Sequence, residues 1–183
     1  MEPHSQQELL TAFANLATSG LEFWAKLPPE VFAAPLGKAW SPAENVRHLT
    51  KSTRPVALSL RLPGVAFLAL FGVADQPSRS YVELRERYQA VLAGGATAGR
   101  FAPRPVAVPH DVGAWQRQVI DDCATAVGAL ARAASRWSET DLDRYRMPHP
   151  LLGKLTLREM LLFTLYHFAH HQQNVVRRLA STQ

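Results

Sequence analysis

Residues 149–179 read HPLLGKLTLREMLLFTLYHFAHHQQNVVRRL and contain a capping box and two of the three most informative histidines of the chain. Thr156 is followed three residues later by Glu159, the spacing of a capping box, in which each side chain accepts a hydrogen bond from the other residue's backbone N–H. Apolar residues then recur at helical spacing. A helix is therefore predicted from Thr156 to about Leu179, and the preceding MPHPLLGKL is expected to be a loop.

A second capping box lies in residues 39–56, which read AWSPAENVRHLTKSTRPV. Ser41 is the expected N-cap, a proline occupies the first helical position, and Glu44 completes the box. Pro55 lies inside the helical pattern, where its ring and missing N–H disrupt a helix. This helix is therefore expected to kink at the proline or to end near Arg54.

Two more amphipathic segments, Ser5–Lys26 and Asp111–Trp137, have apolar residues at helical spacing, whereas alternating strand patterns are nearly absent. Residues 73–110 form an irregular region, with a short helix expected in SRSYVELRERYQAVL followed by a Gly/Pro-rich connection. Four long helices separated by such connections predict an all-α fold, a four-helix bundle with an irregular helical and loop insertion between its second and third long helices. Residues 1–183 are interpreted as one domain.

Charge and hydropathy exclude several classes of protein. The net charge is +5, but the arginines are scattered and no basic run with interleaved aromatic residues is present, so nucleic-acid binding is not expected. The start of the chain lacks the basic and apolar pattern of a signal peptide. The longest apolar stretch, LPGVAFLALFGV at residues 62–73, is too short to span a membrane and is interrupted by Pro63 and Gly64.

Two further expectations concern association and compartment. The stretch at residues 62–73 carries more apolar surface than one flank of a bundle usually exposes, which favours a homodimer; packing against the protein's own core is the alternative. Cys123 is the single cysteine and lies among small apolar residues of a helical run, so it is interpreted as a core residue. One unpaired cysteine and no export signal favour the cytoplasm.

His167 and His171 lie four residues apart on the predicted last helix, which places both on one face with their Cβ atoms about 5–6 Å apart. Two imidazoles in this arrangement can chelate a divalent ion. His170 points about 100° away from His171 and is not expected to join them. Ordinary core or surface histidines also occur at this spacing, so the pair alone does not establish a metal site.

His48 is the third candidate, because two bundle helices with inward histidines can build a site in the core. Glu44, one turn before it, either orients the His48 ring or serves only the capping box. Glu44 is also the single weak candidate for a catalytic carboxylate. His110 and His149 lie in expected loops and are interpreted as solvated.

AWSPAENVRHLTKSTRPV resembles the N-terminal motif of DinB-like proteins, and HPLLGKLTLREMLLFTLYHFAHHQQNVVRRL resembles their C-terminal motif, including its loop glycine and histidine pair. The two motifs cover the first and last thirds of the chain. The resemblance implies a metal-binding four-helix bundle, often dimeric, in which the ligands are His48, His167 and His171. Many relatives follow the two adjacent histidines with Arg-Gly-Gln, whereas residues 172–174 here are Gln-Gln-Asn.

Three imidazoles leave a coordination position open for water or substrate, which is typical of catalytic rather than structural sites. Zinc is the default ion, and nickel or iron also suit imidazole ligands. Some DinB-like relatives transfer low-molecular-weight thiols such as bacillithiol or mycothiol to electrophiles. Two functions of different classes therefore remain open. One is a metal-dependent enzyme that transfers such a thiol or hydrolyses a small-molecule substrate. The other is a non-catalytic module that binds a metal or a small molecule.

Overall fold

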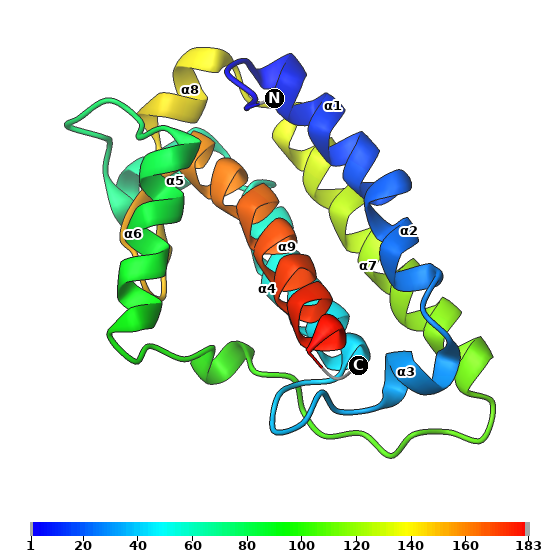
Figure 1. Ribbon diagram of the computed structural model, residues 1–183. Helices are drawn as coiled ribbons and strands as arrows, with labels where there is room; N and C mark the ends of the chain where they lie inside the picture. Colours follow the sequence, from blue (N-terminus) through cyan, green and yellow to red (C-terminus); the bar gives the residue numbers. More distant parts are fainter. Residues whose placement is uncertain (1, 182–183) are drawn as a thin grey trace.

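The computed structural model describes residues 2–181, and these are mostly helical, as the sequence predicts (Figure 1). In chain order the elements are α1 (Gln6–Ala17), the 3₁₀ turn η1 (Ser19–Leu21), α2 (Glu22–Ala25), α3 (Pro29–Ala33), α4 (Pro42–Ser59), α5 (Gly64–Phe71), α6 (Tyr81–Ala93), the 3₁₀ turn η2 (Gly99–Phe101), α7 (Val112–Ala134), α8 (Glu139–Arg144), β1 (Arg146–His149), β2 (Gly153–Thr156) and α9 (Leu157–Ala180).

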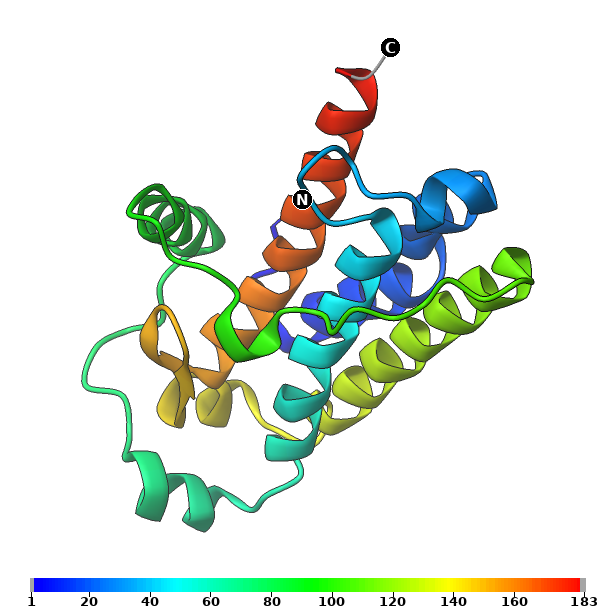
Figure 2. The same cartoon turned by 90° about the horizontal axis from the view of Figure 1, so that it is seen from below.

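The long helices pack around one continuous apolar core. α4 packs most extensively against α7, α1 lies along the other side of α7, and α9 contacts α1, α4 and α6 (Figure 1). The connection from α6 to α7 passes across α4, which is clearest from below (Figure 2). It includes η2, whose contact with α4 matters for the site.

Both predicted capping boxes are present. The Ser41 hydroxyl accepts from the Glu44 N–H at 3.1 Å, and the Glu44 carboxylate accepts from the Ser41 N–H at 2.9 Å. Thr156 and Glu159 exchange the same pair of bonds at 3.1 and 2.9 Å. Each box satisfies two backbone N–H groups that have no partner within the helix, and so determines where α4 and α9 begin.

α4 continues through Pro55, so the expectation that it could end near Arg54 is wrong. It extends to Ser59, although a proline removes one intrahelical hydrogen bond. The turn after the proline is held by burial, since Ala57 and Leu60 lie in the core. Within residues 2–181 no single helix is long and apolar enough to cross a membrane. Only α4 and α5 together reach that length and composition, and they are bent by 107° at their junction.

The segment Ser5–Lys26 is not one helix. α1 ends at Thr18, whose backbone leaves the helical region (φ −110°, ψ −95°) and whose hydroxyl bonds back to the carbonyls of Ala14 and Asn15. The 3₁₀ turn η1 then redirects the chain into α2. Side chains of threonine compete with the backbone in this way, which is why an apolar stripe alone does not reveal the break.

The expected loop before α9 is a β-hairpin. β1 and β2 pair antiparallel, with Arg146 opposite Thr156 and His149 opposite Gly153. Gly153 has φ +77°, a conformation that favours glycine and lets the chain reverse. The strands are too short and too poor in β-branched residues to give an alternating pattern, so the sequence does not predict them.

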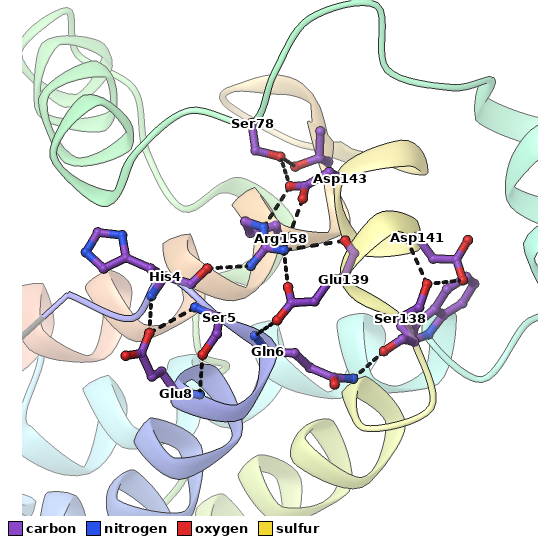
Figure 3. A network of polar contacts seen from close by, with 12 residues as sticks. His4, Ser5, Gln6, Glu8, Ser78, Ser138, Glu139, Asp141, Asp143 and Arg158 are labelled. Atoms are coloured by element: carbon purple, nitrogen blue, oxygen red, sulfur yellow. Dashed lines mark hydrogen bonds and ion pairs between the residues drawn. The ribbon is translucent and has the colours of Figure 1, made fainter.

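A polar network around Arg158 ties the start of the chain to α8 and α9 (Figure 3). The Arg158 guanidinium donates to the Asp143 carboxylate at 2.7 and 3.0 Å, to the Glu139 carboxylate, and to the His4 carbonyl at 3.0 Å. The Ser78 hydroxyl donates to Asp143 at 2.6 Å. The network fixes the end of the molecule from which α9 runs towards the histidines.

Glu159 extends its capping role into a buried ion pair. Its carboxylate accepts from the Arg79 guanidinium at 2.7 and 2.9 Å and from the Arg79 N–H at 2.8 Å, and the Glu159 side chain is only 4% exposed. Burial alone would raise the pKa of Glu159, but the hydrogen bonds from Arg79 and the Thr156 backbone hold that pKa below its usual value. The ionised form of Glu159 therefore stabilises the start of α9.

We expect Glu159→Ala to lower the free energy of unfolding by roughly 3 kcal/mol, the lower end of the range for a broken buried ion pair, because Arg79 remains partly exposed. Glu83→Ala, which removes the corresponding capping-box glutamate at the exposed start of α6, is the matched control and should have a smaller effect. Urea unfolding followed by circular dichroism measures both.

The difference in the free energy of unfolding between the parent protein and Glu159→Ala depends on pH. Because the pKa of Glu159 is lower in the folded state, its contribution is complete above the unfolded pKa of about 4.3 and is lost as the pH falls through the folded value. This difference in the free energy of unfolding should therefore become smaller below about pH 4. An equal gap at pH 7 and pH 3 would contradict an ionic contribution.

Candidate metal centre

Three histidine side chains meet in the core between α4 and α9. The Nε2 atoms of His48 and His167 are 3.1 Å apart, and those of His167 and His171 are 3.0 Å apart. His48 comes from α4, the other two come from successive turns of α9, and all three residues are buried. The structure thus brings together the three residues that the sequence singles out, at distances short enough to share one ion.

The outer nitrogens of two of these rings are held by specific acceptors. His48 Nδ1 donates to the Phe101 carbonyl at 2.9 Å, and His171 Nδ1 donates to the Asn45 side-chain oxygen at 2.6 Å. An acceptor at Nδ1 places the ring proton on that atom, which leaves Nε2 of a neutral ring with an unshared electron pair. The unshared electron pairs on Nε2 of His48 and His171 both face His167.

This arrangement fits a bound cation. His167 Nε2 can carry at most one proton, so it can donate to only one of its two neighbours, and the unshared pair of the other neighbour is then left without a donor. A divalent ion at this point can accept an electron pair from each ring. Two nitrogens bound to one ion at about 2.0–2.1 Å lie roughly 2.9–3.4 Å apart for angles at the ion between about 90° and 110°. The observed separations of 3.0 and 3.1 Å fall within that range.

The surroundings keep the rings neutral, which is the form that binds metal. Burial lowers the pKa of His48. Burial, together with the neighbouring histidines, lowers the pKa values of His167 and His171 well below the ordinary value. All three imidazoles are therefore available as ligands at neutral pH without the loss of a proton.

The Gly/Pro-rich connection between α6 and α7 supplies part of this environment. Carbonyls of residues 101–104 accept hydrogen bonds from three side chains of α4, at 2.9 Å from His48, 2.9 Å from Arg47 and 2.8 Å from Lys51. Two of these donors are charged, which strengthens their bonds. The irregular segment is thereby fixed along the first half of α4 and orients one of the three rings.

Glu44 and His170 lie outside the cluster. The Glu44 carboxylate is engaged in its capping box, and the His48 nitrogen that it could have oriented is bonded to the connection instead. His170 contacts the Tyr166 hydroxyl at 3.4 Å and the Asn174 amide at 2.9 Å. The predicted exclusion of His170 agrees with this placement.

A cavity of about 200 Å³ adjoins the cluster and is bounded by His48 and His167 on that side. Its wall is mostly apolar and includes Phe71, Met160 and Phe163. Among residues 2–181, no aspartate or glutamate lines it. A small molecule in this cavity would therefore lie against the histidines without a carboxylate near it.

His149 also lines the cavity, so the expectation that it is solvated is wrong. Its Nδ1 accepts hydrogen bonds from the backbone N–H groups of Leu151 and Leu152, at 3.2 and 3.0 Å, and closes the hairpin turn. Burial lowers the pKa of His149 to about 4, so the ring is neutral at neutral pH. The sequence signal that could have indicated this role is the short HPLLG turn, in which a side-chain acceptor at the first position caps the backbone.

The family comparison agrees with the site. A model of the DinB superfamily matches residues 5–175, nearly the whole chain, and the protein therefore belongs to this superfamily. The matched region includes all three clustered histidines. Neither the curated proteins nor the solved structures gave a match.

We expect the protein, purified without added metal, to contain close to one divalent ion per chain by elemental analysis. His167→Ala and His171→Ala should each abolish that occupancy, whereas His170→Ala should retain it, because His170 lies on the same helix but bonds elsewhere. Asn45→Ala should weaken metal affinity by roughly 10- to 100-fold, since Asn45 orients His171. A metal-free protein that also fails to bind zinc and nickel in titrations would rule out the centre.

Proposed function

We propose that this DinB superfamily protein is a metal-dependent enzyme that transfers a low-molecular-weight thiol to a small electrophile. His48, His167 and His171 hold the divalent ion, with zinc as the first choice and nickel or iron as alternatives. The observation that carries the proposal is the convergence of three neutral imidazole nitrogens beside a cavity that has no carboxylate in its described wall.

A divalent ion bound here supplies the acidity that favours the thiolate over the thiol at neutral pH. The chain's own residues provide the rest. Asn45 and the Phe101 carbonyl hold two of the rings in orientation, and the mostly apolar wall surrounds the space next to them. With a chlorinated electrophile, the thiol proton passes to solvent, a C–S bond forms, and the C–Cl bond breaks to release chloride.

The absence of a base favours thiol transfer over hydrolysis. A metalloprotease places a glutamate next to its metal as general base, and the described cavity wall has no carboxylate. Burial raises the pKa of Tyr88, also in the wall, to about 12, so its hydroxyl stays protonated at neutral pH and does not serve as a base. His149 Nδ1 is already occupied by two N–H donors. A bound thiol needs no such base, whereas an amide or ester substrate gains most from one.

The fold supports the architecture expected of such a protein. We propose that α1 with α2, α4, α7 and α9 form the four-helix bundle of a single domain, supported by one continuous core and by a family match over residues 5–175. We also propose a cytoplasmic location, where low-molecular-weight thiols remain reduced. The buried Cys123, whose pKa burial raises to about 11, takes no part in the chemistry.

We further propose that the protein is a homodimer associating through α5. The outward face of α5 and the chain just before it are unusually apolar, with Leu58, Val65 and Leu70 each more than 60% exposed. Exposed apolar surface of this kind marks an interface in many proteins. A second copy of the same face would cover it on both chains.

The thiol-transfer proposal is tested with metal-loaded protein, monochlorobimane as electrophile, and bacillithiol, mycothiol or glutathione as thiol. We expect conjugation of at least one thiol above the uncatalysed rate. His48→Ala should reduce the rate to background, because two remaining ligands hold the ion too weakly and alter its acidity. His170→Ala, which removes a histidine of the same helix that lies outside the cluster, is the matched control and should stay active.

The alternatives give different outcomes in the same preparation. Hydrolysis of ester or amide substrates, with no thiol conjugated, would replace the transferase by a hydrolase. If no thiol conjugates faster than with His48→Ala and the ester and amide substrates also remain intact, the protein is a metal- or small-molecule-binding module.

The dimer proposal predicts twice the monomer mass in light scattering at micromolar concentration. Leu70→Glu should shift the protein to the monomer, because it places a charge in the apolar face. Val176→Glu, at another exposed apolar position on α9, should leave the mass unchanged. A monomer mass for the parent protein would contradict association through α5.

A further inference from the structure

The cavity beside the histidine cluster has the size of a single small molecule. Its volume is about 200 Å³, whereas an engineered apolar cavity of about 150 Å³ holds benzene. One ring with a short substituent, or a branched chain of similar size, therefore fits. The buried methionines Met147 and Met160 lie in its wall with Phe163, so the occupant is held mainly by apolar contacts.

The His149 ring provides a hydrogen-bond donor in this wall that has no partner among residues 2–181, and the buried Thr53 hydroxyl is a second unpartnered group there. Because His149 Nδ1 accepts two backbone N–H groups, the proton of the neutral ring is on Nε2. No acceptor for that N–H occurs among residues 2–181. The atom is also not one of the fully buried unsatisfied polar atoms of that part of the chain. His149 thus offers a fixed donor to whatever occupies the cavity.

The donor and the metal candidates lie along one wall. The Phe163 ring lies 4.4 Å from the His149 ring and 5.3 Å from the His167 ring, measured between centroids. A compound the size of one ring can therefore lie on Phe163 with one end at His149 and the other towards the cluster. Its hydrogen-bond acceptor would then contact His149 Nε2–H, and its apolar part would contact the apolar wall.

We propose that this cavity binds a small, uncharged, apolar compound of about one ring that carries a hydrogen-bond acceptor such as a carbonyl oxygen, and that His149 Nε2–H binds this acceptor. The inference rests on the proposed function only in identifying the occupant as the electrophile. Binding itself requires no turnover. His149 is thereby a substrate-binding residue in addition to closing the hairpin turn.

The charges around the cavity favour an uncharged occupant. Arg100 is the one lysine, arginine, aspartate or glutamate among the described lining residues, and it is exposed, with its guanidinium 5.1 Å from the centre of the Phe101 ring. A charged ligand group at the His149 end of the cavity would lose its hydration with no charged side chain beside it, which is strongly unfavourable. A single N–H donor compensates a neutral acceptor but not a full charge.

The methionines make this testable without any assay of activity. The chain has three methionines, Met1, Met147 and Met160, so two of three methyl signals report on the cavity. Zinc-loaded, full-length protein labelled with ¹³C at the methionine methyl groups is titrated with acetophenone and with ethylbenzene. Both compounds should shift the Met147 and Met160 signals, and acetophenone should bind roughly three- to tenfold more tightly because only it accepts a hydrogen bond.

Two variants of His149 separate its hydrogen bond to the ligand from its role in closing the hairpin turn. His149→Asn keeps an acceptor for the Leu151 and Leu152 N–H groups but removes Nε2–H. It should melt near the parent temperature and bind the two compounds equally. His149→Gln retains an amide donor near the Nε2 position and should still favour acetophenone, which tests the donor even if the asparagine variant is unstable.

Several results would overturn the inference: no methyl shift with either compound up to its solubility limit, equal binding of the two by the parent protein, or a retained preference in His149→Asn. Failure of the proposed function looks different. Methyl shifts without thiol conjugation would remove the transferase and keep the cavity ligand. Thiol conjugation without methyl shifts would keep the transferase and remove the cavity ligand.

Discussion

Three imidazole rings are packed into the core with inner nitrogens 3.0 and 3.1 Å apart, and the outer nitrogens of two of them are fixed as donors. That combination leaves at least one unshared electron pair in the core without a hydrogen-bond donor, because His167 Nε2 can donate to only one of its two neighbours. A protein core tolerates such groups only when they are compensated, because an unpaired buried polar group costs about 1–3 kcal/mol. A shared cation would compensate all three at once. Because the rings lie at the point where α4 and α9 meet, an ion bound there would stabilise the contact between the two helices.

The outer partners couple the two helices in both directions. α4 contributes His48 to the cluster and also Asn45, which orients His171 of α9. The third element, the connection between α6 and α7, orients His48 through the Phe101 carbonyl and is itself held by two charged side chains of α4. A shift of any one element therefore misaligns a ring. Metal binding and the packing of these three segments are expected to stabilise each other, as is general where a site forms only on folding.

Local signals explain why much of this is predictable from the sequence. A capping box and a pair of histidines four residues apart are both set within one turn or two of helix, so α4, α9 and the shared face of His167 and His171 follow directly. The Phe101 carbonyl was not predictable, because every residue carries the same backbone oxygen and only the tertiary path selects one. The sequence left open whether α4 kinks at Pro55 or ends near Arg54, and it continues because burial of the following turn outweighs the lost hydrogen bond.

The same rule of imidazole chemistry gives opposite results at two histidines that line the cavity, His48 and His149. At His48, an acceptor on Nδ1 keeps the proton outside and leaves an unshared pair facing the cluster. At His149, two donors on Nδ1 leave the proton on Nε2, where it serves as a donor. Neither role requires a change of protonation near neutral pH, because burial lowers the pKa of both rings. Under the proposed function, the His48 end of this wall would face a cation and the His149 end an electron-rich atom, which is the polarity that an electrophile needs when a thiolate approaches from the metal side.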